Sequence, residues 1–347
     1  MKRILIFTLL AFSIHFYLHP AGKDTIKVID HFDRVVEISK NPKRVIALQP
    51  IAVQIIYCLD YQDNLIACDN MTKVREWAKK IDPGLGKKDA LTFGGDNPPN
   101  IEAIAALHPD LVIYGAFWPQ HIEAISKVAT VIAFDFHLRS TVEAVDLIGK
   151  SIGKEKEAKE LIKYIEEKTK YVTDITDKIP LKEKPKTLYE TYQSTSGGFS
   201  LSTCGNKAFQ HGLIQKAGGI NLGEKFNVIW QIVDPEQLLA WDPDVMFMRP
   251  PDVSGQKSVT IKELEADPVL NKLSLVKNKK YFIMPYGEFS SSVNAPEGVI
   301  GLLFMAKKLH PDKFKNLDLE KEVKYFYQRW FRYKLTDKEV YEILNPQ

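Results

Sequence analysis

Two serine-rich stretches of the sequence carry side chains that could act as nucleophiles. They are Ser194-Thr195-Ser196-Gly197-Gly198 and Ser290-Ser291-Ser292. Neither stretch forms a G-x-S-x-G turn, and the chain contains no H-E-x-x-H, P-loop or G-x-G-x-x-G motif. The paired glycines suit turns or a close approach of the backbone to a ligand. We therefore expect a protein that is not an enzyme.

Histidine and cysteine are the other side chains that could do chemistry, because both bind transition metals. Beyond the N-terminal segment the histidines are isolated: His31, His108, His121, His137, His211 and His310. The three cysteines, Cys58, Cys68 and Cys204, show no C-x-x-C spacing. A receptor for a bare metal ion is therefore only a rival interpretation. We expect buried free thiols, with a Cys58–Cys68 bridge as the alternative.

The elements that must position these residues follow a regular alternation in the first half of the chain. Four short apolar runs are separated by helix-like stretches: Val45–Leu48, Leu65–Cys68, Leu111–Tyr114 and Val131–Phe134. Such an alternation is typical of a parallel sheet covered by helices on both faces. Ahead of these runs, the segments Thr25–Ile29 and Arg34–Ile38 predict a short hairpin.

A long amphipathic pattern follows in the middle of the chain. Apolar residues recur at helical spacing from Leu161 to Ile179, and no Gly or Pro lies between Gly153 and Pro180. The pattern predicts one connecting helix over residues 151–180, which acts as a rigid strut between two lobes. A second amphipathic pattern, over residues 319–344, predicts helix packed on a lobe.

An internal repeat supports the two lobes. Residues 101–112 align without gaps with residues 235–246, an offset of 134 positions, and Glu102 and Glu236 occupy the same place. In both copies a Pro-Asp turn leads into an apolar run. We therefore expect an N-terminal α/β lobe over 22–150 and a C-terminal α/β lobe with C-terminal helices over 181–347.

The N-terminus has the pattern of a secretory signal. Lys2 and Arg3 precede an apolar run from residue 4 to residue 18, and residues 1–21 are the expected signal peptide. The run is shorter than the roughly 20 residues that span a bilayer. Because no cysteine lies near its end, we expect no lipid anchor. We expect an exported, periplasmic protein, and we expect it to be a monomer. The 47 basic and 44 acidic residues nearly balance, which argues against nucleic acid as a partner.

The paired Glu and Pro-Asp segments, the mid-chain helix and the signal together resemble the helical-backbone class of periplasmic solute-binding proteins. The segment Leu213–Asn221 is also similar to a helix-to-loop signature of that class. The resemblance implies two Rossmann-like lobes with parallel central sheets, joined by one long α-helix, with a ligand cleft between them. Members of the class serve ABC importers of ferric siderophores, haem, cobalamin and related metal chelates.

The resemblance also implies which residues face the cleft, because ligands bind beyond the carboxyl ends of such strands. The implied ligand-binding residues are Gln49, Pro50, Phe93, Gly94, Phe117, Trp118, His137, Tyr192, Trp230, Arg249 and Tyr286. Aromatic faces with one or two cations suit a flat or anionic metal complex. Tyr286 and His137 are the residues that we expect to reach the metal, if any does.

The expected ligand is a ferric siderophore or a nickel or iron complex of a small chelator, and we expect no intrinsic cofactor. Cobalamin and haem remain alternatives within the class. Glu102 and Glu236 match glutamates that, in the family, pair with arginines of the ABC permease dimer in the inner membrane. The structural alternative is that both are solvated charges near a helix N-terminus.

Overall fold

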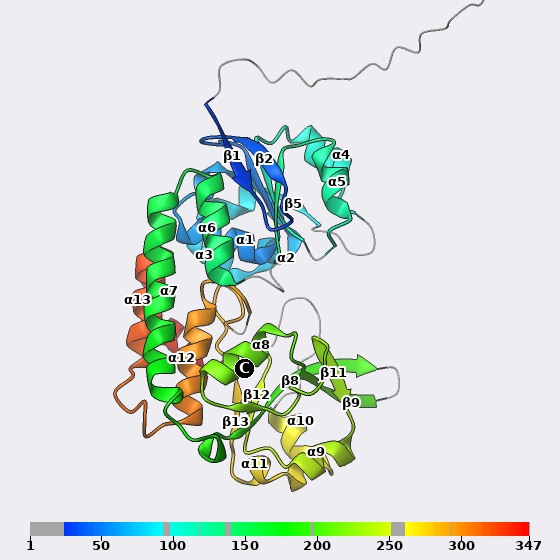
Figure 1. The fold of residues 1–347 in the computed structure, drawn as a ribbon, viewed down its shortest axis with the longest axis vertical. Helices are drawn as coiled ribbons and strands as arrows, with labels where there is room; N and C mark the ends of the chain where they lie inside the picture. The colour runs from blue at the N-terminus through cyan, green and yellow to red at the C-terminus, as the bar shows by residue number, and fades with distance from the viewer. Residues whose placement is uncertain are drawn as a thin grey trace, which may run out of the picture.

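The computed structural model describes residues 24–92, 98–116, 118–135, 140–195, 198–250, 261–291 and 293–346, with only the backbone of 191–195, 198–200 and 235. Two α/β lobes lie one above the other, and helices run along one side of both (Figure 1). The predicted fold class is confirmed. Within these residues no helix is both long and apolar enough to cross a membrane.

The first lobe is built on a five-stranded sheet in which all neighbouring strands are parallel. Its spatial order is β5 (Asp89–Leu91), β4 (Leu65–Asp69), β3 (Val45–Leu48), β6 (Leu111–Gly115) and β7 (Val131–Phe134). Its helices are α1 (Pro50–Cys58), α2 (Asn70–Val74), α3 (Glu76–Ile81), α4 (Ile101–Ala106), α5 (His121–Ser126) and α6 (Thr141–Ser151). The predicted hairpin is β1 (Thr25–Ile29) and β2 (Val35–Ser39).

The second lobe has the same strand order with an antiparallel addition. Its path is β11 (Trp230–Val233), β9 (Gly198–Cys204), β8 (Lys186–Thr195), β12 (Val245–Met248) and β13 (Tyr281–Ile283), and β10 (Ile220–Asn221) also pairs with β8. Strands β12 and β13 run parallel to β8, whereas β8 and β9 form a hairpin. Its helices are α8 (Phe209–Lys216), α9 (Pro235–Trp241), α10 (Ile261–Ala266), α11 (Ser274–Lys277) and α12 (Gly298–Leu309).

The internal repeat is visible in the backbone of α4 and α9. Asn100 caps the N-terminus of α4 and Asp234 that of α9, each by accepting a backbone hydrogen bond with its side chain. Just after the two helices, His108 and Asp242 both adopt the left-handed conformation, with φ of 43° and 39°. These two residues are also 134 positions apart, so the two copies share local structure as well as sequence.

A basic residue at the start of the first strand of each lobe fixes the end of the repeated helix. Arg44 donates to the carbonyl oxygens of Leu107 (2.7 Å) and His108 (3.2 Å), at the end of α4. Lys186 donates at 2.7 Å to each of the two equivalent carbonyl oxygens after α9. Because helix ends leave carbonyl groups without partners, a cation there stabilises the turn into the next strand.

The connecting helix is α7 (Glu155–Thr176), which starts later than the predicted range of 151–180. Its 22 residues span about 33 Å. Gly153 interrupts the helix with a φ of 70°, where a Cβ atom would lie 2.6 Å from the Asn41 side chain. The chain therefore turns between α6 and α7.

Two more helices brace the lobes beside α7. The helix α13 (Leu319–Trp330) packs along α7, with Phe326 and Trp330 about 6 Å from the ring of Tyr164 (Figure 1). Residues of α13 and α14 (Asp337–Leu344) are buried in the core of the first lobe, and α12 contributes to the cores of both lobes. The helices that we expected with the C-terminal lobe thus pack against the N-terminal one, and α7 is not the only connection.

A buried polar cluster lies where these helices meet the first lobe; we refer to Gln54, Glu288, Glu297 and Tyr327 as the junction cluster. Gln54 donates to Glu288 (2.7 Å) and Glu297 (3.2 Å), and its own carbonyl accepts from the Glu297 amide (2.9 Å). Tyr327 donates to Glu297 (2.7 Å) and accepts from the Glu288 amide (2.8 Å). Burial raises the pKa of Glu288 to about 7 and that of Glu297 to about 8.

The substitution Tyr327→Phe should destabilise the protein by about 1–3 kcal/mol, because it leaves a buried carboxyl oxygen and a buried amide without their shared partner. Chemical denaturation measures the change. Tyr341→Phe, on the exposed side of α14, is the matched control and should change stability by less than about 0.5 kcal/mol. Equal effects of the two substitutions would contradict a structural role for the cluster.

Candidate functional site

The carboxyl ends of the strands of both lobes meet at the junction. Gln54, in the helix that follows β3, bonds to Glu288 and Glu297 in the segment that follows β13. Thr141, at the start of the helix after β7, donates to Asn294 of the same segment at 2.5 Å. The edges that the sequence predicts as ligand-binding therefore face each other.

In the first lobe the carboxyl end of β3 carries Gln49 and Pro50, both buried. Gln49 is the N-cap of α1 and accepts from the Ile51 amide with its side chain. Its side chain also covers Gly115, where a Cβ atom would lie 2.5 Å from the Gln49 Cγ atom. Gln49 is thus fixed in place by the neighbouring strand β6.

Trp118 follows β6 and is half-buried. Its indole stacks on the ring of His121, with centroids 6.2 Å apart and planes 22° apart. The Tyr114 hydroxyl lies 3.3 Å from both the Trp118 carbonyl oxygen and His121 Nδ1. The loop after β6 thus holds one face of an indole against the protein.

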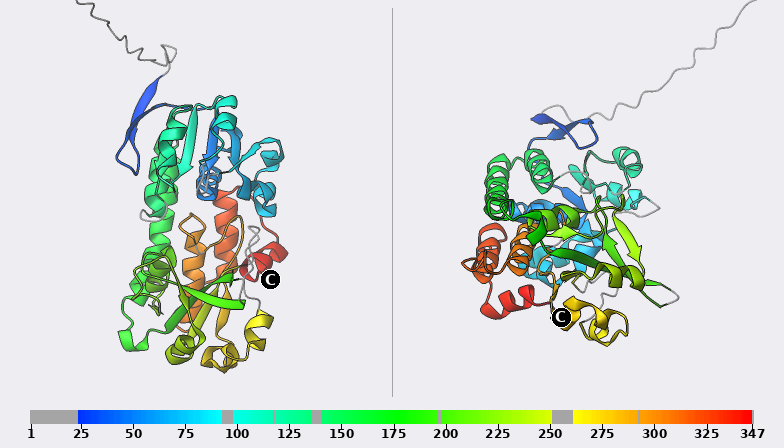
Figure 2. Two further views of the ribbon diagram at one scale, coloured as in Figure 1. Left: turned by 90° about the vertical axis from the view of Figure 1, so that its right-hand side faces the viewer. Right: turned by 60° about the horizontal axis from the view of Figure 1, so that its bottom comes forward.

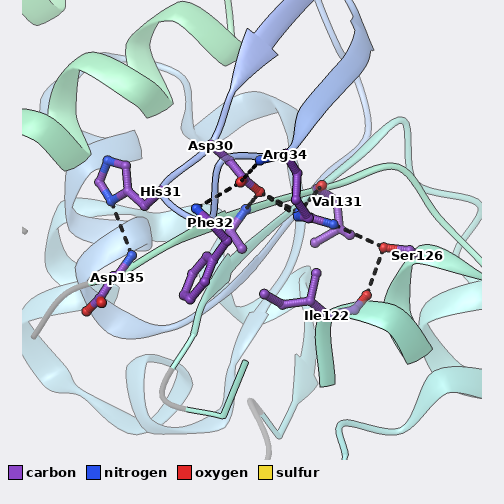
Figure 3. Close-up of polar contacts among 9 residues, drawn as sticks. Asp30, His31, Phe32, Arg34, Ile122, Ser126, Val131 and Asp135 are labelled. Carbon is purple, nitrogen blue, oxygen red and sulfur yellow. Dashed lines mark hydrogen bonds and ion pairs between the residues drawn. The ribbon is translucent and has the colours of Figure 1, made fainter. Parts of the chain in front are cut away.

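The β1–β2 hairpin supports the end of β7 (Figure 3). The buried carboxylate of Asp30 pairs with Arg34 (2.5 Å) and accepts from the Ala133 amide (3.1 Å). His31 Nδ1 accepts from the Asp135 amide at 3.2 Å, just past β7. The hairpin therefore fixes the backbone at the carboxyl end of β7.

In the second lobe, Trp230 and Arg249 are half-buried. The Trp230 ring lies 6.3 Å from that of the buried Tyr189. Arg249 directly follows β12, and its amide donates to the Glu190 carbonyl at 3.2 Å. Tyr192 belongs to β8, opposite Leu201 of β9.

Tyr286 lies just beyond β13 and is half-buried. Its amide donates to the Ile343 carbonyl of α14 at 2.9 Å. The C-terminal helix therefore positions the residue that the resemblance offers as a metal ligand. Among the residues that the structure describes, no group of three or more His, Cys, Asp or Glu side chains could hold a metal ion.

Four predicted residues, Phe93, Gly94, Phe117 and His137, lie outside the described residues. Their roles stay predictions. The predicted state of the cysteines is confirmed, because Cys58, Cys68 and Cys204 are buried free thiols.

Sequence reasoning missed three charged side chains that the fold buries at this junction. Arg75 is 2% exposed, and its guanidinium lies 4.1 Å above the Phe289 ring without a hydrogen-bond partner. Glu190 and Glu288 are at most 1% exposed. For Glu190 the sequence signal is an acid that ends the apolar pair Leu188-Tyr189, and the same signal marks ordinary strand ends. Arg75 and Glu288 stand in polar stretches and carry no such signal.

A cavity of about 750 Å³ lies on the α7 side of the junction. It is lined from both lobes, for example by Thr141, Ile165, His211 and Val299. None of the described residues that line it belongs to the predicted ligand-binding set. The cavity and the predicted cleft residues thus occupy different parts of the junction.

The two repeated glutamates lie on exposed surface. Glu102 and Glu236 each occupy the second position of a short capped helix, one in each lobe. Arg44 and Lys186 hold the far ends of these helices in the same way. The two carboxylates are therefore presented by equivalent frameworks.

Two lobes of parallel strands, with facing carboxyl edges and a helical brace, define a two-lobed binding protein. The family model described as "Periplasmic binding protein" matches residues 45–286. The chain belongs to the periplasmic binding protein family.

Individual relatives agree with this assignment. The molybdate-binding protein MolA of Haemophilus influenzae is 25% identical over 336 residues, covering 88% of this chain and 90% of its own. The Fe(3+)-citrate-binding protein YfmC of Bacillus subtilis is 27% identical over 266 residues, covering 75% and 78%. A periplasmic solute-binding protein of Veillonella parvula superposes with a TM-score of 0.78 at 22% identity, covering 92% and 97%. The relatives are transporter binding proteins, so the prediction that this chain is not an enzyme is confirmed.

The contact between Gln49 and Gly115 gives a test of the first-lobe edge. Gly115→Ala should cost about 1–3 kcal/mol, because the new methyl group would overlap Gln49 and approach the buried Phe134 ring at 3.0 Å. Gly86→Ala is the matched control, because a Cβ atom there would have no neighbour within 4 Å. Chemical denaturation of both variants measures the difference. A neutral Gly115→Ala variant would show that Gln49 is free to move.

Proposed function

We propose that this protein captures a small anionic metal chelate, of the ferric citrate type, and delivers it to the permease of an ABC importer. Proteins of its family serve ABC transporters as substrate-binding components. The observation that carries the choice of ligand is the half-buried Arg249 at the end of β12, with the half-buried Trp230 at the start of β11 in the same sheet. A guanidinium binds a carboxylate-rich chelate with two parallel hydrogen bonds, and indole faces cover its flat parts.

The relatives support an anionic ligand. The Fe(3+)-citrate-binding protein and the molybdate-binding protein are named for different metals, yet both ligands present anionic oxygen atoms. Iron or nickel would arrive as part of the ligand rather than as a resident cofactor. Siderophore, haem and cobalamin complexes belong to the same test panel.

Molybdate itself is the second candidate. MolA matches 88% of this chain, more than the ferric citrate protein does. A tetrahedral oxyanion is bound by hydrogen-bond donors rather than by aromatic faces. The guanidinium of Arg249 would supply such donors. Competition between molybdate and ferric citrate on one sample would rank the two.

Titration of tryptophan fluorescence should show saturable quenching by ferric citrate, with molybdate, nickel–histidine, a ferric siderophore, haem and cobalamin as the other probes. Arg249→Gln should weaken binding of the anionic probe about 10- to 100-fold, since a charge-assisted hydrogen bond contributes about 1.5–3 kcal/mol. Arg329→Gln, which removes an exposed ion pair on α13, is the control and should not change the affinity. A flat response to all the probes would rule out the chelate proposal.

We also propose that Glu102 and Glu236 dock the protein on the permease dimer, one carboxylate per subunit. Their equivalent frameworks in the two lobes support this role, because paired acidic side chains at a fixed separation can bind two equivalent arginines.

Reversing both charges, Glu102→Arg with Glu236→Arg, should leave ligand affinity unchanged and reduce ligand-stimulated ATPase activity of the reconstituted importer at least tenfold. Glu123→Arg with Glu320→Arg, at other exposed helix starts, is the matched control. Full stimulation by the docking variant would overturn the proposed role.

The proposed site of action is the periplasm. The signal-like pattern of residues 1–21 supports export with cleavage.

A further inference from the structure

Glu190 is a buried acid in the middle of β8, beside the last residue of β12, and no structural contact explains it. It is 1% exposed, and neither carboxyl oxygen has a hydrogen-bond partner. Directly opposite on β9, Thr203 is also 1% exposed, and its hydroxyl likewise has no partner. Buried polar groups are normally hydrogen-bonded, so a carboxyl and a hydroxyl left together without partners require a reason.

The repeat shows that the fold does not need an acid at this position. In the first lobe, Leu48 lies beside Tyr114 of β6; in the second, Glu190 lies beside Met248 of β12. Tyr114 and Met248 are 134 positions apart, so Leu48 and Glu190 are equivalent in register. Leu48 is fully buried in an apolar cluster. The second lobe thus carries a carboxyl group where the same framework accepts leucine.

The surroundings of Glu190 favour its uncharged form. An ionised carboxylate without donors is so costly to bury that the group keeps its proton instead. Burial raises the pKa of Glu190 to about 8, and Arg249 acts in the opposite direction. Thr203 of β9 lies opposite Glu190, and Met248 and Arg249 lie beside it at the end of β12. Among the described residues, Arg249 is the charged side chain that lowers the pKa of Glu190.

We propose that Glu190 is a specificity-determining residue: as an uncharged acid it adds no negative charge beside Arg249, and on ionising it repels an anionic ligand from the cleft. The proposal rests on the proposed function in taking the ligand of Arg249 as an anion. With leucine at this position the affinity for an anion would not depend on pH at this site. With glutamate the affinity depends on whether the carboxyl group is protonated.

The sign of the effect follows from the protonation state. Below about pH 8 Glu190 is neutral, and it adds no negative charge beside Arg249. Above that pH the carboxylate lowers the local potential, so affinity for an anion falls and affinity for a cation rises. By linkage, anion binding at high pH must take up a proton.

The first experiment uses the protein without any ligand. The unfolded chain ionises Glu190 near the ordinary value of 4.5, whereas the folded protein keeps the proton to about pH 8. Wild-type stability should therefore fall relative to Glu190→Gln as the pH rises through this window. The difference in Tm between the two proteins should grow from about pH 5 to about pH 8 and then level off. In an Arg249→Gln background the levelling should move to higher pH, because Arg249 lowers the pKa of Glu190.

The second experiment measures affinity for molybdate, which remains a dianion from about pH 6.5 upward, and for ferric citrate. Between pH 7 and pH 9.5 wild-type Kd should rise about fivefold or more relative to that of Glu190→Gln, a typical size for coupling between two sites. Glu190→Leu, the residue of the other lobe, should fold and also lose the pH dependence. Glu224→Gln, an exposed acid of the same lobe, is the control and should behave like wild type.

The outcomes separate the two proposals. A Tm difference that does not change with pH overturns the role of Glu190. The role is also overturned if the pH at which this difference becomes constant is the same with and without Arg249→Gln. An affinity ratio that stays constant with pH overturns it as well. If no probe binds, the proposed function fails, and the ligand-free comparison still decides whether Glu190 is an uncharged acid coupled to Arg249.

Discussion

The hydroxyl group of Tyr327 is the contact on which the arrangement of the two lobes depends. The hydroxyl accepts a hydrogen bond from a backbone amide and donates one to a carboxyl group, both in the segment that returns from the second sheet. The helix that carries Tyr327 is buried in the core of the first lobe. Gln54 adds three bonds from the first lobe to the same segment. Because every partner is buried, a change in the angle between the lobes would leave polar groups without partners. The cleft is therefore held largely preformed.

Much of the fold was predictable because it follows from local periodicity. The buried strands of the first lobe, the hairpin and the paired helix-and-turn units all appear where the sequence indicates. The β8–β9 hairpin was not predicted, since an apolar strand does not reveal the direction of its partner. The partner of α13 was not predictable either, because an amphipathic pattern shows that a helix buries one face and not what covers that face. The start of α7 was placed too early because the predicted range included Gly153, whose positive φ turns the chain between α6 and α7.

For the candidate site, the sequence located positions better than it located interactions. Strand ends such as Gln49 and Arg249 could be found because parallel strands present their carboxyl ends at one edge. Glu190 could not be found in this way, because the neighbouring strands determine its burial and its lack of hydrogen-bond partners. Comparison of the two repeats shows that the strand edges have diverged while the outer frameworks have not. Glu190 occupies the register position that Leu48 has in the first lobe, whereas Arg44 and Lys186 bind equivalent helix ends. The equal parts suit the proposed partner with two equivalent halves, whereas the unequal parts lie beside Arg249, at the proposed ligand site.

The brace of α7, α12 and α13 has a consequence for turnover. In a receptor whose lobes open and close widely, the ligand can dissociate through thermal motion alone, because the open form binds it weakly. A receptor held by three helices and a network of buried hydrogen bonds has no such low-energy open form, so its ligand leaves slowly in free solution. If the permease binds both lobes, as proposed, it can apply a torque across the brace. Release of the ligand would then be coupled to docking on the transporter.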